Sequence, residues 1–484
     1  MKYFFCTLIL ALAFTSKAQS FNEKIVSTPL SNACFGAIGV SDDLFFSLTN
    51  ADEYFGNNQS CMVYHTDANL NIIDSIDLTT HNGAVEFNIN NLVKASDSTF
   101  WVIGNVLYTQ PNASAAHAVL FDVNLNIIDE LIHYTPLDST AWWLSIEKVD
   151  SFTVVGGYQF DQGFHPGYWI FDNKGDLFFS NVLDTVSRGA ITGLQYVNES
   201  LLFGLTFMPF HSRGEINLND FTINKIIKDD RASNGGSLFI NGFIDVGVSS
   251  NDIWGYGQLA VQTLALVKMD SNLNQVAIDT FSTTPGKWTK VDRGMLDASA
   301  HNKLYFVTAE DAKFTASDLQ PGLMNNMKLW RVDTGGNVIW SVLVNDSSYY
   351  FPTKTVATSD GGAVFFSMKY DWRKDVAPKT DLSIIKLDSN GNFVGLHEME
   401  LPYQKPLAVS VYPNPAVDEI SLAGVELRDL AAILVYTIDG ILVKEVVNPQ
   451  SLTISMEDVS AGTYVIHTLY KNGRQGMGKV IKGK

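Results

Sequence analysis

Aromatic side chains next to polar or charged ones are the chemically most informative sets in this sequence. Flat aromatic rings can stack on sugar rings or peptide segments, and neighbouring Arg, His or Asp side chains can fix a ligand's orientation. The predicted ligand-binding residues lie between expected strands: Trp142, Trp143, His165, His211, Arg213, Trp288, Tyr349, Tyr350, Trp372 and Arg373. Packing of the same rings at the ends of strands is the alternative interpretation.

Carboxylates could instead support hydrolysis of a polysaccharide, which needs two of them about 5–10 Å apart. The candidates are Asp161, Glu310, Asp311 and Asp371, and the sequence does not place them together. It contains no His-Glu-x-x-His motif, no Gly-x-Ser-x-Gly motif, no phosphate-binding loop and no dinucleotide-binding glycine pattern. The nine His are scattered without a pair at metal-ligand spacing. Catalytic residues therefore stay unknown, and we expect neither a metal nor a cofactor.

Three Asp-x-Asn-x-Asn segments, beginning at Asp67, Asp270 and Asp388, resemble the start of a calcium-binding loop. They lack the later bidentate Glu, and each offers a single carboxylate where tight calcium sites use several. Asp and Asn also stabilise tight turns, because their side chains bond to the nearby backbone. We therefore predict turns, with calcium as the alternative.

These turns belong to a repeat that must position any site. An apolar run, an Asp, three residues, an Asn or Asp and a second apolar run recur, with the first Asp at Asp67, Asp122, Asp172, Asp220, Asp270, Asp333 and Asp388. Dense apolar strands recur in phase, beginning at Leu44, Phe100, Phe152, Leu201, Ile253, Leu304 and Ala363. Copies of roughly 50 residues, each with four short strands, predict a seven-bladed β-propeller over residues 19–401. A solenoid is the alternative, although its coils are usually shorter.

Strand directions within a blade alternate, so the turns after strands one and three share one face of a propeller. The loops after strand two and the links between blades share the other face. The first set is short and regular here, whereas the second is irregular and carries the aromatic candidates. Because function usually lies on loops held by a rigid scaffold, the irregular face is the predicted binding surface.

The first 18 residues have the pattern of a secretory signal peptide. Lys2 precedes an apolar stretch from Tyr3 to Phe14, and Ser16 and Ala18 are small residues at the cleavage positions. The stretch is too short for a membrane-spanning helix, which needs about 20 residues. We predict cleavage after Ala18 and no transmembrane segment in the mature chain; an uncleaved anchor is the alternative.

Cys34 and Cys61 remain after removal of the signal peptide. Export places both in an oxidising environment, where a disulfide between them could form. Two small buried thiols are the alternative.

The chain changes character after a Pro-containing linker at residues 402–408. Seven short alternating strands follow within residues 409–484: Ser410–Tyr412, Glu419–Leu422, Ile433–Ile438, Ile441–Val446, Leu452–Ser455, Thr463–Leu469 and Gly478–Ile481. Asp439-Gly440 and Asn472-Gly473 are hairpin signals, because Gly accepts positive φ. The pattern predicts a small Ig-like β-sandwich.

Four motifs in this region resemble the C-terminal sorting domain of type IX (Por) secretion cargo, a family of one Gram-negative phylum. They are Val411–Ala416, Val435–Gly440, Val459–Val465 and Lys479–Lys482. The resemblance implies export to the periplasm, passage through an outer-membrane translocon, and release or surface attachment by a sortase. It assigns the sorting signal to Pro413, Asn414, Pro415, Gly440, Gly462, Tyr464 and Lys479. An ordinary accessory sandwich is the alternative.

Charge narrows the possible partners. The chain has 33 Lys and Arg against 51 Asp and Glu, a formal net charge of −18. Acidity argues against nucleic acid and against anionic membrane surfaces as partners. The sequence thus predicts an all-β, secreted or cell-surface protein that binds a glycan or a protein without catalysis. A polysaccharide hydrolase or lyase and a structural adhesin are the alternatives.

Overall fold

The computed structural model describes residues 24–26, 31–51, 58–84, 86–108, 113–136, 140–160, 163–183, 189–197, 200–206, 212–228, 238–244, 253–259, 263–270, 272–282, 289–290, 296–299, 303–310, 319–373, 379–394, 407–437, 442–470 and 475–483. Helical structure in these ranges is confined to two short 3-10 helices, η1 (His81–Gly83) and η5 (Leu427–Asp429). None of the helical segments in the described part of the chain has the length and apolarity of a membrane span. The predicted signal peptide lies outside the described residues, so its cleavage after Ala18 stays a prediction.

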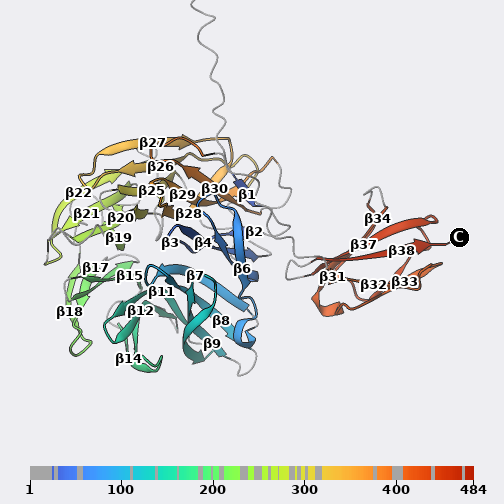
Figure 1. The fold of residues 1–484 in the computed structure, drawn as a ribbon, viewed down its shortest axis with the longest axis horizontal. Helices are drawn as coiled ribbons and strands as arrows, with labels where there is room; N and C mark the ends of the chain where they lie inside the picture. Colours follow the sequence, from blue (N-terminus) through green and yellow to red (C-terminus); the bar gives the residue numbers. More distant parts are fainter. Residues whose placement is uncertain are drawn as a thin grey trace, which may run out of the picture.

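The described strands between Lys24 and Leu387 form seven sheets, one for each copy of the repeat, which we number as blades 1 to 7 (Figure 1). Blade 1 contains β2 (Ser31–Ala33), β3 (Ala37–Val40), β4 (Asp43–Ala51), β5 (Asn58–Thr66) and β6 (Ile72–Asp77). Blade 2 contains β7 (Glu86–Lys94), β8 (Thr99–Tyr108), β9 (Ala113–Asp122) and β10 (Ile127–Pro136). Blade 3 contains β11 (Thr140–Val149), β12 (Phe152–Phe160), β13 (Phe164–Phe171) and β14 (Leu177–Val182).

The remaining blades continue in chain order. Blade 4 contains β15 (Ala190–Val197), β16 (Ser200–Thr206), β17 (Ser212–Ile216) and β18 (Ile223–Lys228). Blade 5 contains β19 (Leu238–Ile244), β20 (Ile253–Leu259), β21 (Thr263–Met269) and β22 (Gln275–Phe281). Blade 6 contains β23 (Thr289–Lys290), β24 (Leu296–Ser299), β25 (Lys303–Glu310), β26 (Met327–Val332) and β27 (Val338–Val344). Blade 7 combines β28 (Tyr349–Ala357), β29 (Ala363–Tyr370) and β30 (Asp381–Leu387) with β1 (Lys24–Val26).

The blades form a closed ring, which confirms the predicted propeller. Each blade contacts the next in chain order, and blade 7 returns to blade 1 through contacts of β28 with β3 and of β30 with β2. A solenoid would leave its first and last repeats apart, so that alternative is wrong. Closure matters energetically because each blade has two apolar faces that only its neighbours can cover.

Blade 7 differs from the expected repeat of four consecutive strands. Its outer strand is β1, which pairs antiparallel with β30 and sets Lys24 opposite Ile384 and Val26 opposite Leu382. In the described residues after the last Asp turn, the chain pairs with blade 7 only through the bridge between Leu387 and Phe393. The N-terminal strand thus closes the ring by covering the exposed edge of the last sheet.

Many Phe side chains of the propeller pack between neighbouring blades. At the junction of blades 7 and 1, one apolar cluster contains Phe46 and Phe366, whose ring centroids lie 5.5 Å apart. Phe45 and Phe100 join blades 1 and 2 at a centroid distance of 4.5 Å. Complete burial of such a side chain contributes roughly 1.5–3 kcal/mol.

The C-terminal domain is a sandwich of two sheets around one apolar core. One sheet contains β31 (Leu407–Ala408), β38 (Gln475–Lys482), β37 (Gly462–Tyr470), β34 (Leu430–Thr437) and β35 (Leu442–Val447). The other contains β32 (Ser410–Tyr412), β33 (Glu419–Ala423) and β36 (Thr453–Ser455). All seven predicted strands are present. Because β31 pairs with β38, Leu407 and Ala408 of the predicted linker also belong to this sheet.

Candidate functional site

The Asp turns are closed by their own side chains. In the turn at Asp388, Oδ1 accepts hydrogen bonds from the backbone N–H groups of Asn390 (2.8 Å) and Asn392 (2.9 Å), and Oδ2 accepts one from the Asn392 side chain at 3.0 Å. Asp67 and Asp270 repeat this arrangement. These bonds lower the pKa of the Asp388 carboxyl. The Asp carboxylates therefore form hydrogen bonds to their own turns, which favours the predicted role in turns over calcium binding.

The innermost strands of several blades carry a β-bulge at the same level. The pairing register shifts between Ile89 and Asn91 in β7, between Trp143 and Ser145 in β11, and between Pro352 and Lys354 in β28. A bulge bends its strand and redirects the neighbouring side chains. Here the bulged segments line a cavity on the ring axis.

This axial cavity has a volume of about 270 Å³, and every blade contributes to its wall. Lys354 is buried there, and its Nζ donates a hydrogen bond to Oδ1 of Asn91 at 2.8 Å. Asn91 in turn donates to the carbonyl of Leu144 at 3.2 Å, so blades 7, 2 and 3 are connected. Asp297 is the single carboxylate among the described residues of the wall, whereas glycoside hydrolysis normally uses a pair.

Two of the predicted ligand-binding residues lie together near the end of blade 3. Trp142 belongs to a row of four rings, with Tyr158, Phe160 and Phe164, that we call the aromatic ladder. Successive ring centroids are 5.8 Å (Trp142 and Tyr158), 5.3 Å (Tyr158 and Phe164) and 5.1 Å (Phe164 and Phe160) apart. Phe160 is 43% exposed and Phe164 40% exposed. The half-buried His165 follows Phe164 in the same hairpin.

A second set of predicted residues gathers on blade 7. Tyr349 is buried in an apolar cluster against which Trp372 packs, whereas Tyr350 is buried in a different cluster between blades 6 and 7. Nε of Arg373 lies 2.7 Å from Oδ1 of Asp371, and this interaction raises the pKa of Arg373. The two Tyr rings therefore stabilise the blade, while the Arg373 side chain keeps partial contact with solvent.

Two other predicted ligand-binding residues in the described part of the chain lie apart from both groups. Trp143 is buried in the core between blades 2 and 3. Arg213 is also buried, and its Nε donates to the carbonyl of Leu273 in the next blade at 2.6 Å. His211 and Trp288 lie outside the described residues. Ligand binding at any of the predicted positions stays a prediction.

The candidate catalytic carboxylates have structural partners where they are described. Glu310 is buried and accepts a hydrogen bond from the backbone N–H of Asn326 at 3.2 Å, and Asp371 is buried against Arg373. Asp161 and Asp311 lie outside the described residues.

The two Cys do not form a disulfide in the structure. Both thiols are free and buried, Cys34 in the apolar cluster between blades 7 and 1 and Cys61 in that between blades 1 and 2. Burial raises the pKa of each thiol to about 12, so both stay protonated and unreactive at neutral pH. The alternative of two packed thiols describes the structure.

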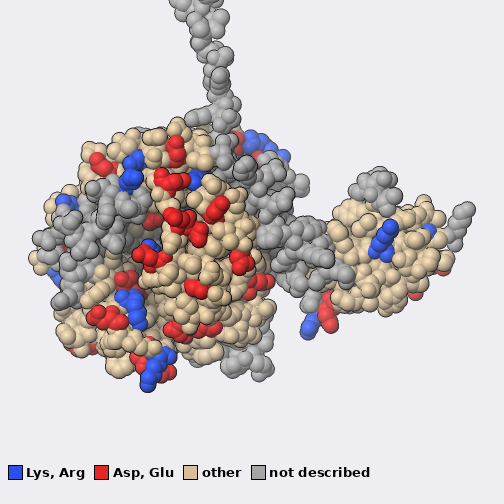
Figure 2. Space-filling view, in the orientation of Figure 1, with Lys and Arg blue, Asp and Glu red and all other residues tan. Residues whose placement is uncertain are grey.

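Acidic residues outnumber basic residues in the propeller. Residues 19–408 contain 24 Lys and Arg but 43 Asp and Glu, and Figure 2 shows carboxylates spread over the ring with fewer cations between them. A surface of this kind repels polyanions.

The sorting motifs occupy defined places in the C-terminal domain. Asn414 connects its Pro-flanked loop to β38: its Oδ1 accepts from the N–H of Ile481 at 2.9 Å, and its Nδ2 donates to the carbonyl of Lys479 at 3.1 Å. Tyr464 is buried, and its hydroxyl donates to the carbonyl of Ser460 at 2.7 Å. Pro413, Pro415, Gly462 and Lys479 belong to these same segments, whereas Gly440 lies outside the described residues.

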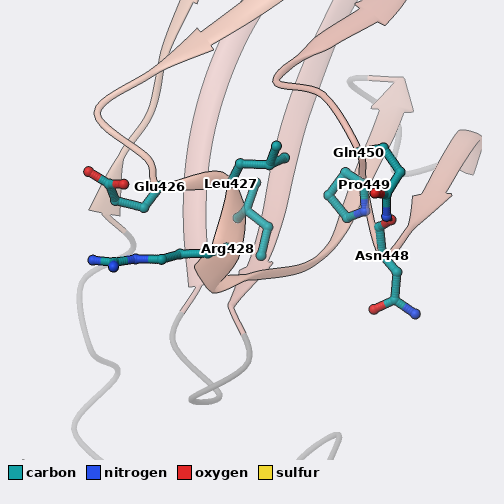
Figure 3. A pocket seen from close by; sticks show the side chains of 7 residues that line it. Glu426, Leu427, Arg428, Asn448, Pro449 and Gln450 are labelled. Carbon is teal, nitrogen blue, oxygen red and sulfur yellow. The ribbon is translucent and has the colours of Figure 1, made fainter. Parts of the chain in front are cut away.

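The same domain carries an open hollow of about 500 Å³ between η5 and the segment after β35 (Figure 3). Glu426, Leu427 and Arg428 lie on one side, and Asn448, Pro449 and Gln450 on the other. The hollow holds both charges and amides, which suits a polar contact surface more than an enclosed ligand site.

Comparisons with known proteins agree with the C-terminal domain. Residues 410–483 match the family described as "Secretion system C-terminal sorting domain". A comparison with curated proteins found no match. The chain is therefore a propeller with a type IX secretion tail, a combination that indicates export to the cell surface or beyond.

Solved structures, among them two propellers, are similar to this chain at low sequence identity. The β-propeller domain of the Trilobed protease from Pyrococcus furiosus shares 12% identity, with a TM-score of 0.43 and coverage of 77% of this chain and 100% of that one. The Dos1 propeller shares 12% identity, with a TM-score of 0.42 and coverage of 75% and 80%. A phage phi92 endosialidase shares 10% identity, with a TM-score of 0.41 and coverage of 95% and 87%.

Proposed function

We propose that the exported propeller is a non-catalytic module that binds a neutral glycan. The aromatic ladder of blade 3 is the observation that supports this role. Large apolar side chains are normally buried, and Phe160 and Phe164 are instead neighbours with about two-fifths of each exposed. Their faces offer the stacking surfaces that sugar rings use, because the CH groups of a sugar pack against an aromatic ring.

The charge of the propeller supports a neutral ligand over an acidic one. An anionic polysaccharide would approach a domain with 43 acidic and 24 basic residues, and like charges reduce both affinity and the rate of association. A neutral glycan avoids this cost. Export also brings the propeller to the cell exterior, where it can meet such polymers.

A glycan array with the full mature chain tests this proposal. We expect binding to neutral glycans and weak or no binding to sulfated and uronate-containing ones. Trp142→Ala and Phe164→Ala should each weaken binding about 3- to 10-fold, the loss expected for one stacked ring. Phe178→Ala is the matched control, because Phe178 is another exposed aromatic of blade 3 but lies outside the ladder.

Other outcomes would contradict the proposal. Release of sugar fragments by the purified chain would identify a hydrolase or lyase. Self-association without binding to any glycan would support the structural adhesin. Equal glycan binding by Phe164→Ala and the unchanged chain would show that the aromatic ladder does not form the binding site.

The route of export has its own test. A chain that ends at residue 406 lacks the whole sandwich and should accumulate in the periplasm, whereas the full chain should reach the medium or the cell surface. Cell fractionation with an antibody against the propeller measures this distribution. Delivery of the shortened chain to the exterior would exclude the sandwich as the sorting signal.

A further inference from the structure

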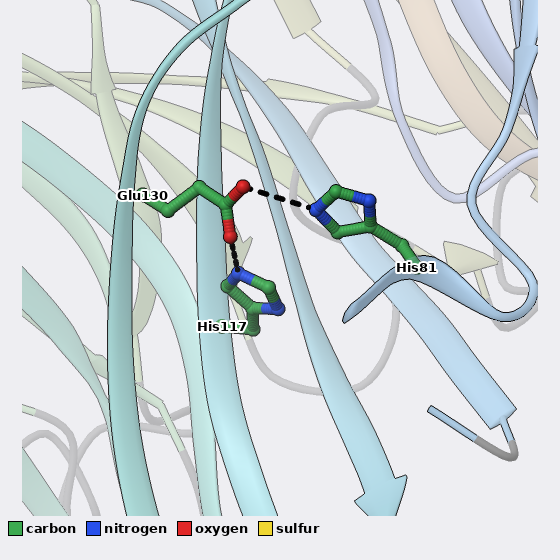
Figure 4. Close-up of side chains that lie close together, drawn as sticks. All are labelled: His81, His117 and Glu130. Carbon is green, nitrogen blue, oxygen red and sulfur yellow. Dashed lines mark hydrogen bonds and ion pairs between the residues drawn. The ribbon is translucent and has the colours of Figure 1, made fainter. Parts of the chain in front are cut away.

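Three potential metal ligands meet beside blade 2, away from the aromatic ladder. Nε2 of His81 lies 3.2 Å from Oε1 of Glu130, and Nε2 of His117 lies 3.0 Å from Oε2 of the same carboxylate (Figure 4). The ligand atoms of all three residues lie within 4.8 Å of one another. We call this set the His-His-Glu cluster.

The fold explains why these residues meet. His117 lies in β9 opposite Ile132 of β10, and Glu130 lies in β10 opposite Val119. These four residues therefore point to the same face of blade 2, where Val119 and Ile132 pack with residues of blade 1. His81 reaches this face from η1, in the link between blades 1 and 2.

The surroundings hold the three side chains of the cluster in place. His117 is buried between the rings of Phe87 and His81, at centroid distances of 5.5 and 5.7 Å, and burial lowers its pKa. The hydrogen bond from His117 lowers the pKa of Glu130, which is also held by a hydrogen bond from the Asn82 side chain.

We propose that His81, His117 and Glu130 form a binding site for a divalent transition metal ion, with zinc the best match. Two imidazole nitrogens and one carboxylate oxygen are a common zinc ligand set, and a water molecule completes the tetrahedron. A tetrahedral zinc ion with bonds of about 2.0–2.1 Å separates its ligands by about 3.3 Å. The distances of 3.0 and 3.2 Å join the two imidazoles to different oxygens of Glu130, and the ligand atoms of all three residues lie within 4.8 Å of one another. Small side-chain shifts would therefore bring the three ligand atoms to the tetrahedral spacing.

Access and support set the expected strength of binding. The side chains of His81 and Glu130 are 15% and 24% exposed, so an ion can enter from solvent. Nδ1 of His117 has no hydrogen-bond partner among the residues that the structure describes, whereas metal-bound His usually donates from its second nitrogen. Loss of such support costs about 10- to 100-fold in affinity, so we expect weaker binding than in fully supported zinc sites. The bound ion would fasten the link between blades 1 and 2 to the outer strands of blade 2.

Zinc titration of the chelator-treated full chain, without an affinity tag, tests the site. Calorimetry should detect one zinc ion per chain, and zinc should raise the thermal midpoint. Cobalt(II) should give the visible absorption of a four-coordinate ion, which reports ligand geometry directly. His81→Ala and Glu130→Gln should each weaken zinc binding at least about 10-fold and abolish the cobalt spectrum.

A matched control separates this site from zinc binding at another pair of His and carboxylate. His65 also contacts a carboxylate, with Nε2 3.0 Å from Oδ2 of Asp43, and no third ligand of the described residues groups with this pair. His65→Ala should keep the full zinc response. Failure of the unchanged chain to bind zinc at ~1 mM would overturn the proposal. Equal zinc binding by Glu130→Gln and the unchanged chain would also overturn it. Circular dichroism would verify that the Glu130→Gln chain is folded.

Discussion

At the scale of single residues, the Asp turns show how the repeat tolerates strain. The fourth residue has positive φ in six of the seven turns, and it is Gly in three of them but Leu70 (φ 63°), Leu125 (φ 60°) and Leu273 (φ 60°) in the others. The turn at Asp220 differs, because its positive-φ residue is Phe221 (φ 58°). Left-handed geometry costs a non-Gly residue about 1–2 kcal/mol. All three Leu side chains are buried, so the burial of each offsets the strain of its backbone.

Leu70→Gly decides which of these terms is larger. The substitution relieves about 1–2 kcal/mol of strain but removes a fully buried Leu, a change that costs about 2–5 kcal/mol in well-packed cores. We therefore expect a net destabilisation of about 1–3 kcal/mol in urea unfolding. Gly83→Ala is the control for backbone strain alone, because φ of Gly83 is +76° and its Cβ would meet no atom within 4 Å. A more stable Leu70→Gly chain would contradict this account.

The turn carboxylates also predict a dependence of stability on pH. Hydrogen bonds within the turns lower the pKa of Asp122, Asp333 and Asp388 in the folded chain. The unfolded chain then binds more protons in acid, so this part of the stability is present above pH ~4 and is lost as pH falls through the lowered pKa values. Urea midpoints at pH 7, 5 and 3 measure the loss, which should become smaller in Asp388→Asn. An unchanged midpoint at pH 3 would show that the turns do not contribute.

At the scale of elements, local patterns predicted strands well. The second strand of each blade begins within one residue of the predicted position, as Thr99 for Phe100 and Lys303 for Leu304 show. Alternating apolar residues and Asp or Gly turns fix such boundaries within a few positions of the chain. The role of β1 was not predicted, because its pairing joins Lys24 to Ile384 across almost the whole propeller and no local signal marks it.

Deletion of β1 tests ring closure. A mature chain that begins at residue 28 lacks the strand that covers β30 and loses the buried Val26 from the cluster between blades 7 and 1. We expect a lower thermal midpoint and more aggregation, because the uncovered sheet edge can pair with other chains. A chain that begins at residue 23 keeps β1 and serves as the control. Equal midpoints for the two chains would mean that β1 does not hold the ring closed.

At the scale of the whole molecule, donors on one blade hold the turn of the next. The Tyr168 hydroxyl donates to the carbonyl of Phe221 at 2.6 Å, and Arg213 donates in the same way to Leu273 at 2.6 Å. Arg331 contacts the carbonyl of Ser389, and Nζ of Lys386 reaches that of Ala68 at 2.5 Å. The last of these bonds joins blade 7 to blade 1. The same type of contact that connects successive blades therefore also helps to close the ring.

The candidate sites were harder to predict than the fold. The sequence did not show that Trp143 and Tyr350 are buried, because buried and exposed aromatic residues near a strand end have the same sequence pattern. The His-His-Glu cluster was missed, since its members lie on different elements and only the folded sheet unites them. One signal was available: His117 interrupts an otherwise apolar strand, and a buried His needs a partner.

Lys386→Met tests the closing contact between blades 7 and 1. Lys386 is 1% exposed and also pairs with Asp360 at 2.7 Å, whose side chain is 46% exposed. Breaking a fully buried pair costs about 3–5 kcal/mol, and access of solvent to Asp360 reduces our expectation to about 1–3 kcal/mol, measured by urea unfolding. Lys94→Met is the control, because the Lys94 and Asp97 pair is exposed and should contribute little. Equal effects of both substitutions would show that Lys386 acts as an ordinary surface charge, and ring closure would then depend on other contacts, among them β1, the apolar cluster and the hydrogen bond from the Asn32 N–H to the carbonyl of Thr380.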